Sequence, residues 1–241
     1  MHVWRVPLDD AAGAWAMRPL LSAAERAQAD RYHAEIHRVR YAVAHGWLRR
    51  ILARYAGGPP ASLAFGAGPN GKPFLADPAH AALHFNLAHS GALGLVAVSR
   101  APVGVDVEAW DRTVEYLDLA EHFFSPSERV ALGALAHDLV ALGAGFFAAW
   151  SRKEAYLKAT GDGITRGLHH FDVTLGPDEP AALLADRLDA AATRRWAMTA
   201  LDVGPGYSAA LVAQAPLHEV VLMPLEEQSS TDYTDHADSR A

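Results

Sequence analysis

The apolar and polar positions of the chain alternate between the period of a helix and the period of a strand, which predicts an α/β (α+β) fold. Helical spacing, capping residues and closing glycines predict helices at residues 21–33, 38–55, 124–136 and 150–161. β-Branched residues and alternating polarity predict strands at residues 2–6, 84–91, 94–99, 103–108, 170–175, 196–201 and 207–213. Residues 69–75 read PNGKPFL, which is typical of a turn.

One residue does not fit the apolar face of its predicted helix. The stripe from Phe147 to Gly161, which crosses the segment WSRKEAYLKATG, is apolar at helical spacing except at Glu154. A carboxylate that faces a core costs free energy unless a partner neutralises it. Lys158, one turn further along, is one candidate partner, and a bound cation is the other.

Composition limits the class of protein to a globular chain without thiol chemistry. The 241 residues are 51% hydrophobic and 20% charged, and no cysteine is present. No apolar run approaches the roughly 18 residues that cross a bilayer. Residues 1–10 lack the basic region and the apolar core of a signal peptide. We therefore expect a cytoplasmic protein with no membrane partner.

The net charge of −7 is distributed unevenly along the chain. Residues 1–75 carry ten Lys and Arg against five Asp and Glu, whereas residues 76–241 carry eleven against twenty-three. The basic part is suited to a polyanion and the acidic part to cations, although a solvated surface of uneven charge explains the same numbers. Because no basic run with interleaved aromatic residues occurs, we do not expect a nucleic-acid partner.

Two capping boxes belong to an internal repeat with a spacing of 103 residues. The repeated residues are Ser22, Glu25, Arg26, Trp47, Arg49 and Gly58, with their counterparts Ser125, Glu128, Arg129, Trp150, Arg152 and Gly161. Capping boxes also recur for local reasons. If the repeat is structural, it predicts two similar α/β halves, at residues 1–103 and 104–225, with a functional cleft between them. Residues 226–241 lack periodicity and are predicted to form a disordered acidic tail.

Two carboxylates of the predicted strand VGVDVE point to the same face, because Asp106 and Glu108 are two residues apart. Such a pair most often faces solvent. Together with Glu154, however, it provides three oxygen ligands that Mg²⁺ accepts beside water and phosphate oxygens. The alternative pairs Glu154 with Lys158 and needs no metal.

Two further polar residues lie at predicted turns. His89, in NLAHSG, lies where a strand turns, and Lys72 lies between Gly71 and Pro73 on a constrained turn. A structural hydrogen bond explains such a histidine, and simple solvation explains such a lysine. In the functional alternative, the constrained turn holds Lys72 in position to contact a phosphate.

Five motifs follow one another along the chain, namely GKPF, FNLAHSG, GVDVE, FFSPSE and WSRKEAYLKATGDG. In this order they resemble the 4′-phosphopantetheinyl transferases, in the larger two-half class typified by surfactin synthetase activators. The pair GVDVE and WSRKEAYLK is the most specific part, and the likeness extends from about Leu21 to Leu168 and more loosely to Ala213. It implies a monomer built as a pseudo-dimer of two α/β halves, with coenzyme A and Mg²⁺ in the cleft between them.

The resemblance implies a role for each candidate residue at the centre of the site. Asp106, Glu108 and Glu154 match the magnesium ligands of the family. Lys158, with His89 beside it, matches the contact to the coenzyme A pyrophosphate. Glu154 would therefore face a metal at the junction between the halves.

The resemblance also implies how the adenosine end of coenzyme A is held. Arg40 and Lys72 match positions that hold the 3′-phosphate and the adenosine. One departure concerns the residue before the histidine of HSG, which is serine in many relatives and Ala88 in this chain. That departure removes a hydroxyl contact to the cofactor.

The implied reaction transfers the 4′-phosphopantetheine arm of coenzyme A to a serine hydroxyl of an apo acyl or peptidyl carrier protein. The serine attacks the β-phosphorus and 3′,5′-ADP leaves, while Mg²⁺ and the groups of Lys158, His89 and Lys72 stabilise the charge. Glu154 is the first candidate for the general base. Glu128 is the second, because its capping box already explains its presence.

Two other functions share parts of this pattern. A Mg²⁺-dependent phosphohydrolase acting on nucleotides would share the carboxylates, and a non-catalytic module that binds coenzyme A or a carrier would keep the basic groups. The carrier itself, expected from secondary metabolism, is not identified by the sequence. The resemblance places it near residues 110–124, where we expect Arg112 to contact it and both Phe123 and Phe124 to belong to the core.

Overall fold

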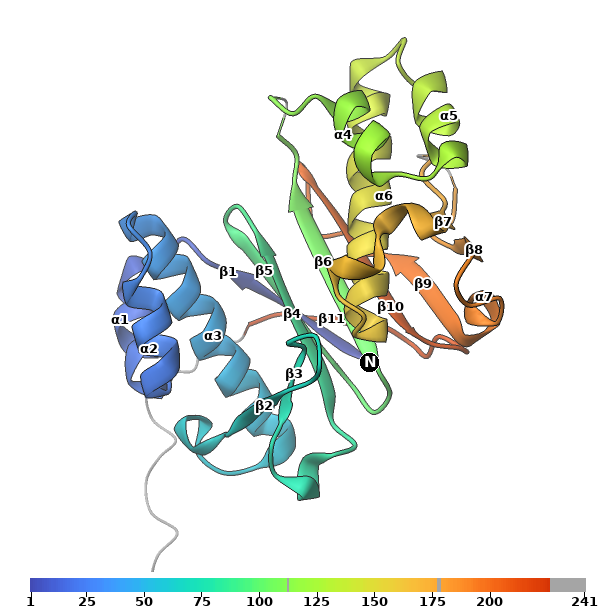
Figure 1. The fold of residues 1–241 in the computed structure, drawn as a ribbon. Coiled ribbons are helices and arrows are strands. Elements are labelled where there is room, and N and C mark those ends of the chain that lie inside the picture. Colours follow the sequence, from blue (N-terminus) through green and yellow to red (C-terminus); the bar gives the residue numbers. More distant parts are fainter. Residues whose placement is uncertain (112, 177–178, 226–241) are drawn as a thin grey trace, which may run out of the picture.

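The computed structural model describes residues 1–111, 113–176 and 179–225, so Arg112 and the tail predicted at 226–241 lie outside the described residues. Within these ranges helices and strands alternate, and the predicted α/β class is confirmed (Figure 1). Within the same ranges, no helix combines the length and the apolar character that crossing a membrane requires.

The first half packs its helices against one face of a sheet of order β11-β1-β5-β4 (Figure 1). Its strands are β1 (His2–Pro7), β2 (Phe65–Ala67), β3 (Pro73–Leu75), β4 (His84–Ser90) and β5 (Leu93–Ser99). Its α-helices are α1 (Ala11–Met17), α2 (Ala23–Asp30) and α3 (Glu35–Ala56), and its 3₁₀ turns are η1 (Arg18–Leu20), η2 (Pro60–Ser62) and η3 (Pro78–His80). Leu48, Ile51 and Leu52 of α3 pack with Val96 and Phe85 of the sheet, and this apolar contact holds the half together.

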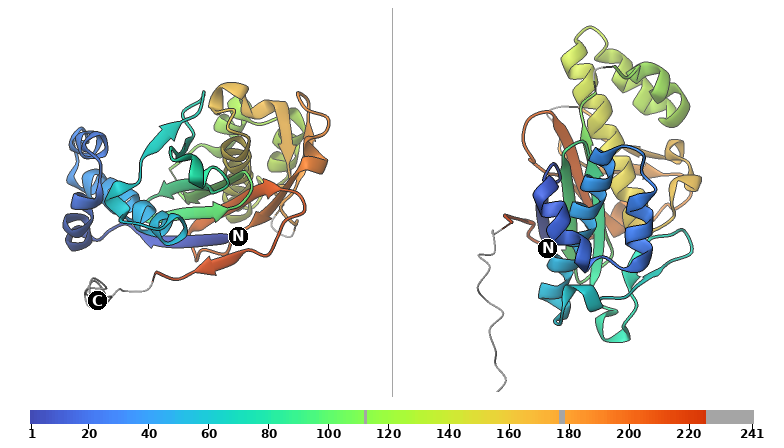
Figure 2. Two further views of the ribbon diagram at one scale, coloured as in Figure 1. Left: turned by 90° about the horizontal axis from the view of Figure 1, so that it is seen from below. Right: turned by 90° about the vertical axis from the view of Figure 1, so that its left-hand side faces the viewer.

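The second half repeats this arrangement around an antiparallel sheet of order β6-β10-β9. Its strands are β6 (Val103–Ala109), β7 (Phe171–Val173), β8 (Leu183–Asp186), β9 (Trp196–Ala200) and β10 (Tyr207–Gln214). The last strand of the described residues, β11 (Val221–Met223), belongs to the first sheet. Its helices are α4 (Tyr116–Phe123), α5 (Pro126–Ala134), α6 (Leu139–Thr160) and α7 (Ala192–Arg195), with 3₁₀ turns η4 (Ile164–Arg166) and η5 (Leu168–His170). Figure 2 shows α1–α3 at one end of the molecule and the second half at the other.

The internal repeat of the sequence corresponds to a repeat of structure. Ser22 and Ser125 each close a complete capping box, and each box precedes a helix of 22 residues that covers a sheet. In the first half Glu25 of the box pairs with the buried Arg49 of α3 at 2.8 Å. In the second half Glu128 pairs with the buried Lys153 of α6 at 2.7 Å. In both halves, therefore, the glutamate of the capping box connects a short helix to a long helix by an ion pair with a buried cation.

The two sheets meet along β4 and β6, which run side by side in the same direction. Side chains rather than backbone groups join these strands: Asn86 Oδ1 accepts a hydrogen bond from the Val105 N–H at 2.8 Å, and Ser90 Oγ accepts one from the Ala109 N–H at 3.0 Å. A shared apolar core lies behind them, formed by residues of both halves such as Val3, Leu95, Val107 and Leu211.

The boundaries of the halves differ from those predicted. A division between residues 103 and 104 falls inside β6, which begins at Val103. The strand β11 crosses back and pairs in parallel with β1, with His2 opposite Val221. Residues 221–223 therefore complete the sheet of the first half, although the sequence placed them in the second.

Candidate functional site

The helix α6 lies directly on the strand β6 because Gly104 has no side chain. A Cβ atom at Gly104 would lie 2.1 Å from the Ala155 carbonyl oxygen and 2.3 Å from the Ala159 nitrogen. Only glycine permits this approach of two backbones. The last turns of α6 are thereby placed beside Asp106 at the junction of the halves.

Four charged side chains lie together at this junction. Lys158 Nζ donates a hydrogen bond to Asp106 Oδ1 at 2.5 Å, and the other oxygen of Asp106, Oδ2, is buried without a partner. Glu108 accepts a hydrogen bond from Ser90 Oγ at 3.0 Å. Glu154 is half-buried on α6, one turn before Lys158. The ion pair between Lys158 and Glu154 that helical spacing suggested is thus replaced by one between Lys158 and Asp106.

The electrostatics of the junction disfavour three ionised carboxylates. Burial, with a smaller effect of the negative charges of Glu108 and Glu154, raises the pKa of Asp106 to about 7 against the opposing effect of Lys158. Burial also raises the pKa values of Glu108 and Glu154. One ammonium group therefore faces three carboxylates, an imbalance that a divalent cation would relieve.

The residues fit a hard cation in chemistry, but their side chains do not gather around one point. The partnerless Asp106 Oδ2 and the excess of carboxylate oxygens are features of an oxygen-ligand site. Among the residues that the structure describes, however, no three acidic or histidine side chains are grouped as metal ligands. Lys158 holds Asp106 and Ser90 holds Glu108, so the predicted ligands share a junction without converging as a set.

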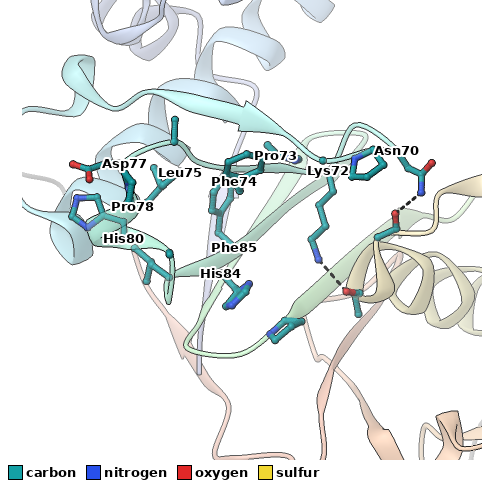
Figure 3. Close-up of a pocket in the computed structure, with 18 of the residues that line it drawn as sticks. Asn70, Lys72, Pro73, Phe74, Leu75, Asp77, Pro78, His80, His84 and Phe85 are labelled. Carbon is teal, nitrogen blue, oxygen red and sulfur yellow. Dashed lines mark hydrogen bonds between the residues drawn. The ribbon is translucent and has the colours of Figure 1, made fainter.

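Two small pockets open beside the four charged groups. The first, of about 220 Å³, is lined by Asn70, Gly71, Lys72, Pro73, Asn86, Glu154, Leu157, Lys158, Gly161 and Gly163. The second, also of about 220 Å³, is lined by Tyr32, His37, Arg40, Tyr41, His89, Ser90 and Gly91. A larger pocket of about 570 Å³ shares Asn70, Lys72, Pro73 and Gly161 with the first but contains none of the four charged residues of the junction (Figure 3). Glu154 and Lys158 line the first small pocket, and the second contains Arg40 and the Ser90 that bonds to Glu108, so the chemistry points to these two pockets.

The second pocket contains the predicted phosphate contacts Arg40 and His89. The Arg40 guanidinium forms two hydrogen bonds with Asp9, at 2.6 and 3.1 Å, so an anion bound there would share or displace this carboxylate. His89 lies at the rim. Partial burial of its ring, together with the neighbouring His45, Lys158 and Arg40, lowers its pKa. His89 is therefore suited to act as a neutral hydrogen-bonding group.

Lys72 lines the first pocket, but its ammonium is already engaged. Lys72 Nζ donates hydrogen bonds to the carbonyl oxygens of Val103 at 2.9 Å and Ala159 at 3.1 Å. Burial lowers the pKa of Lys72 to about 8. The free ammonium that the sequence suggested for a phosphate is not what the structure shows.

Glu128 has a structural task that occupies both of its oxygens. Oε1 accepts a hydrogen bond from the Val173 N–H at 2.8 Å, and Oε2 pairs with Lys153, while only 3% of the residue is exposed. Glu25 is the counterpart of Glu128 in the first half, and it makes the same kind of buried ion pair, with Arg49. We therefore withdraw Glu128 as a candidate base.

Three polar residues of the junction were missed by reasoning from the sequence. Ser90 and Asn86 bridge β4 to β6, and Asn70 contacts the end of α6. The only signal for Ser90 was its place in NLAHSG, directly after the histidine. Ala88 is buried in the shared core, and the hydroxyl at this strand end is that of Ser90.

The segment predicted to meet a carrier lines a separate pocket of about 480 Å³ between α4 and the start of α6. Phe124 is buried, which confirms the prediction that it belongs to the core. Phe123 and Leu117 are 36% and 44% exposed, so the prediction for Phe123 is wrong. Arg112 lies outside the described residues.

The comparison with known proteins agrees with this geometry. The model of the 4′-phosphopantetheinyl transferase superfamily matches residues 102–212, which span β6, α6 and most of β10. The 4′-phosphopantetheinyl transferase HetI of Nostoc sp. is 40% identical over 186 residues, which cover 76% of this chain and 77% of that protein. The 4′-phosphopantetheinyl transferase psf-1 of Bacillus pumilus is 36% identical, with 69% of each chain covered. The 4′-phosphopantetheinyl transferase Sfp of Bacillus subtilis is 30% identical, with 70% of this chain and 71% of that protein covered. With four charged side chains at the junction of two similar halves, and with relatives of this identity and coverage, the chain belongs to the 4′-phosphopantetheinyl transferase superfamily.

Proposed function

We propose that the protein transfers the 4′-phosphopantetheine arm of coenzyme A to a serine hydroxyl of an apo carrier protein, in a Mg²⁺-dependent reaction that releases 3′,5′-ADP. The observation that carries this proposal is the junction itself. Glu154 and Lys158 line one small pocket, and Lys158 pairs with Asp106. Arg40, His89 and Ser90, which bonds to Glu108, line the other. A basic pocket on one side and acidic groups on the other suit a phosphate diester of a nucleotide together with a divalent cation.

The metal ligands would be Asp106, Glu108 and Glu154, whose oxygens are of the type that Mg²⁺ prefers. When bound, the ion would neutralise the charge that develops on the departing phosphate oxygens. Lys158 would bind the pyrophosphate by exchanging Asp106 Oδ1 for a phosphate oxygen, since its side chain is 30% exposed toward the pocket. A phosphate and a carboxylate offer an ammonium group similar charge-assisted hydrogen bonds.

The 3′-phosphate would lie in the second pocket. Arg40 would bind it in place of Asp9, because a guanidinium presents the same pair of N–H donors to a carboxylate and to a phosphate. His89, at the rim, would donate a hydrogen bond to a neighbouring phosphate oxygen.

The proton of the carrier serine needs a base within reach. Glu154 is half-buried in the first pocket, and burial raises its pKa above the usual value for a glutamate. A more basic carboxylate accepts a proton more readily from a hydroxyl that is being activated. We therefore assign this role to Glu154, directly or through one water molecule.

The decisive experiment is to incubate the protein with coenzyme A, Mg²⁺ and an apo carrier, and then to weigh the carrier by intact mass spectrometry. We expect the carrier to gain the mass of one phosphopantetheine arm, and Lys158→Ala to abolish that gain. Glu219→Gln, an exposed acidic change between β10 and β11, serves as the control and should retain the activity. Hydrolysis of coenzyme A without a gain of mass would instead indicate a phosphohydrolase, and binding without either reaction would indicate a non-catalytic module.

A further inference from the structure

The turn between β2 and β3 reaches across the junction to the end of α6. Figure 3 shows the side chains of Asn70 and Lys72 pointing from this turn toward the last residues of the helix. Asn70 Nδ2 donates a hydrogen bond to the Gly161 carbonyl oxygen at 2.9 Å, and Lys72 Nζ donates one to the Ala159 carbonyl oxygen at 3.1 Å. The partners are 91 and 87 residues apart in the chain.

These contacts supply what the end of a helix lacks. The last carbonyl groups of an α-helix have no partner within the helix, and they form the negative end of its dipole. The backbone closes α6 with Gly161 in the left-handed conformation, whose N–H bonds to the Leu157 carbonyl oxygen. The Ala159 carbonyl oxygen is satisfied instead by a cation from the other half of the protein.

The same ammonium also contacts the second element of the site. Lys72 Nζ donates to the carbonyl oxygen of Val103, the first residue of β6. Lys72 thus joins the end of α6, which carries Lys158, to the start of β6, which carries Asp106. A change at Lys72 would alter the spacing of the two elements that hold the Lys158–Asp106 pair.

We infer that residues 69–72 form a latch, in which Asn70 and Lys72 of the first half position the last turn of α6 against β6 for phosphopantetheinyl transfer. This inference rests on the proposed function and makes both side chains positioning residues, without contact to the reacting atoms. The burial that lowers the pKa of Lys72 to about 8 costs free energy, which an apolar side chain at this position would avoid. The hydrogen bonds of Lys72 to the two carbonyl oxygens offset part of this cost.

The latch and a 3′-phosphate contact predict different behaviour for Lys72. A residue that reads the 3′-phosphate discriminates between coenzyme A and dephospho-coenzyme A, whereas a positioning residue affects the turnover of both equally. Asn70 carries no charge, so it separates the two roles further. The variant Asn70→Asp keeps the shape of the side chain, removes the donor to Gly161 and places a negative charge at the negative end of α6.

The experiment combines hydrogen–deuterium exchange with steady-state kinetics on Lys72→Met, Asn70→Asp and the control Arg100→Met, which removes a cation from the neighbouring exposed turn. For the two latch variants we expect the amides of residues 157–163 to exchange at least about fivefold faster, the scale for losing one intramolecular hydrogen bond. We also expect kcat to fall about tenfold, by the same factor for coenzyme A and dephospho-coenzyme A, because small misplacements of catalytic groups are costly. Lys72→Arg, which keeps a cationic donor, should recover part of the turnover.

Each contrary outcome has its own meaning. Unchanged exchange in both variants overturns the latch, and faster exchange with unchanged kcat overturns its positioning role. A KM that rises for coenzyme A alone, in Lys72→Met alone, makes Lys72 a phosphate reader instead. If the unmodified protein transfers no phosphopantetheine, the proposed function fails, while the exchange rates still decide whether the turn holds the helix.

Discussion

The substitution Gly104→Ala tests whether α6 and β6 approach as closely as the structure describes. The added methyl group would meet three backbone atoms, namely Ala155 O at 2.1 Å, Ala159 N at 2.3 Å and Lys158 C at 2.8 Å. Overpacked sites cost about 1–3 kcal/mol when neighbouring side chains can adjust. Backbone atoms of a helix cannot rotate aside, so we expect a loss of about 3 kcal/mol or more. For a chain of this length, that corresponds to a fall in Tm of about 6–12 °C.

The chain offers a matched control for this measurement. Gly133 lies in α5, and a Cβ atom there would meet nothing within 4 Å. Gly133→Ala should therefore leave the stability unchanged or raise it by about 0.5–1 kcal/mol, through helix propensity alone. Urea unfolding followed by tryptophan fluorescence compares the two variants with the unmodified protein. If Gly104→Ala unfolds within 1 kcal/mol of the unmodified protein, the close contact of α6 with β6 is refuted, together with the placement of Lys158 that depends on it.

Four further predictions concern the charged and exposed groups. Asp106→Ala should lower the transfer rate more than about a hundredfold with the fold intact by circular dichroism, the scale for removing a strong electrostatic group, and near-normal turnover at low Mg²⁺ would remove it from the site. Arg40→Ala should weaken the binding of coenzyme A by about 1.5–3 kcal/mol in a calorimetric titration, and the binding of dephospho-coenzyme A by less. Equal losses of binding free energy for the two ligands would exclude a 3′-phosphate contact. Leu117→Glu should raise the KM for the carrier and leave that for coenzyme A unchanged, and wild-type carrier kinetics would place docking elsewhere. Burial alone would raise the pKa of Glu25, but hydrogen bonds from His45 and Arg49 lower it to about 2. Its contribution to stability is therefore present above pH 4.5 and lost as the pH falls through about 2, so Glu25→Gln should destabilise the protein by roughly 1–2 kcal/mol at pH 7 and by little at pH 2.

The elements that could be predicted from the sequence are those with local signals. The capping boxes at Ser22 and Ser125 form as expected, because their hydrogen bonds join residues three apart. Several missed elements are short: α1, α4, β2, β3, β8 and β11 each span eight residues or fewer. The first half of α6, residues 139–149, was missed as well. A short element shows too little periodicity to be recognised, and β11 forms only because β1 is present beside it.

The candidate site divides in the same way. The period of a strand placed Asp106 and Glu108 on one face, and the period of a helix singled out Glu154. The partners of these residues could not be predicted. Lys158 binds Asp106, 52 residues away, rather than the glutamate one helical turn from it.

By itself the sequence therefore determined the α/β class, the two capping boxes, the family and the carboxylates of the site, since each depends on residue types at short spacing. Only the tertiary structure decided which charges pair. Arg40 is held by Asp9, Lys72 by the ends of β6 and α6, and Glu128 by Lys153. These pairs join segments from 25 to 87 residues apart. The physical reason is that a buried charge is stable only beside a partner, and which partner is near depends on how distant segments of the chain pack together rather than on any local pattern.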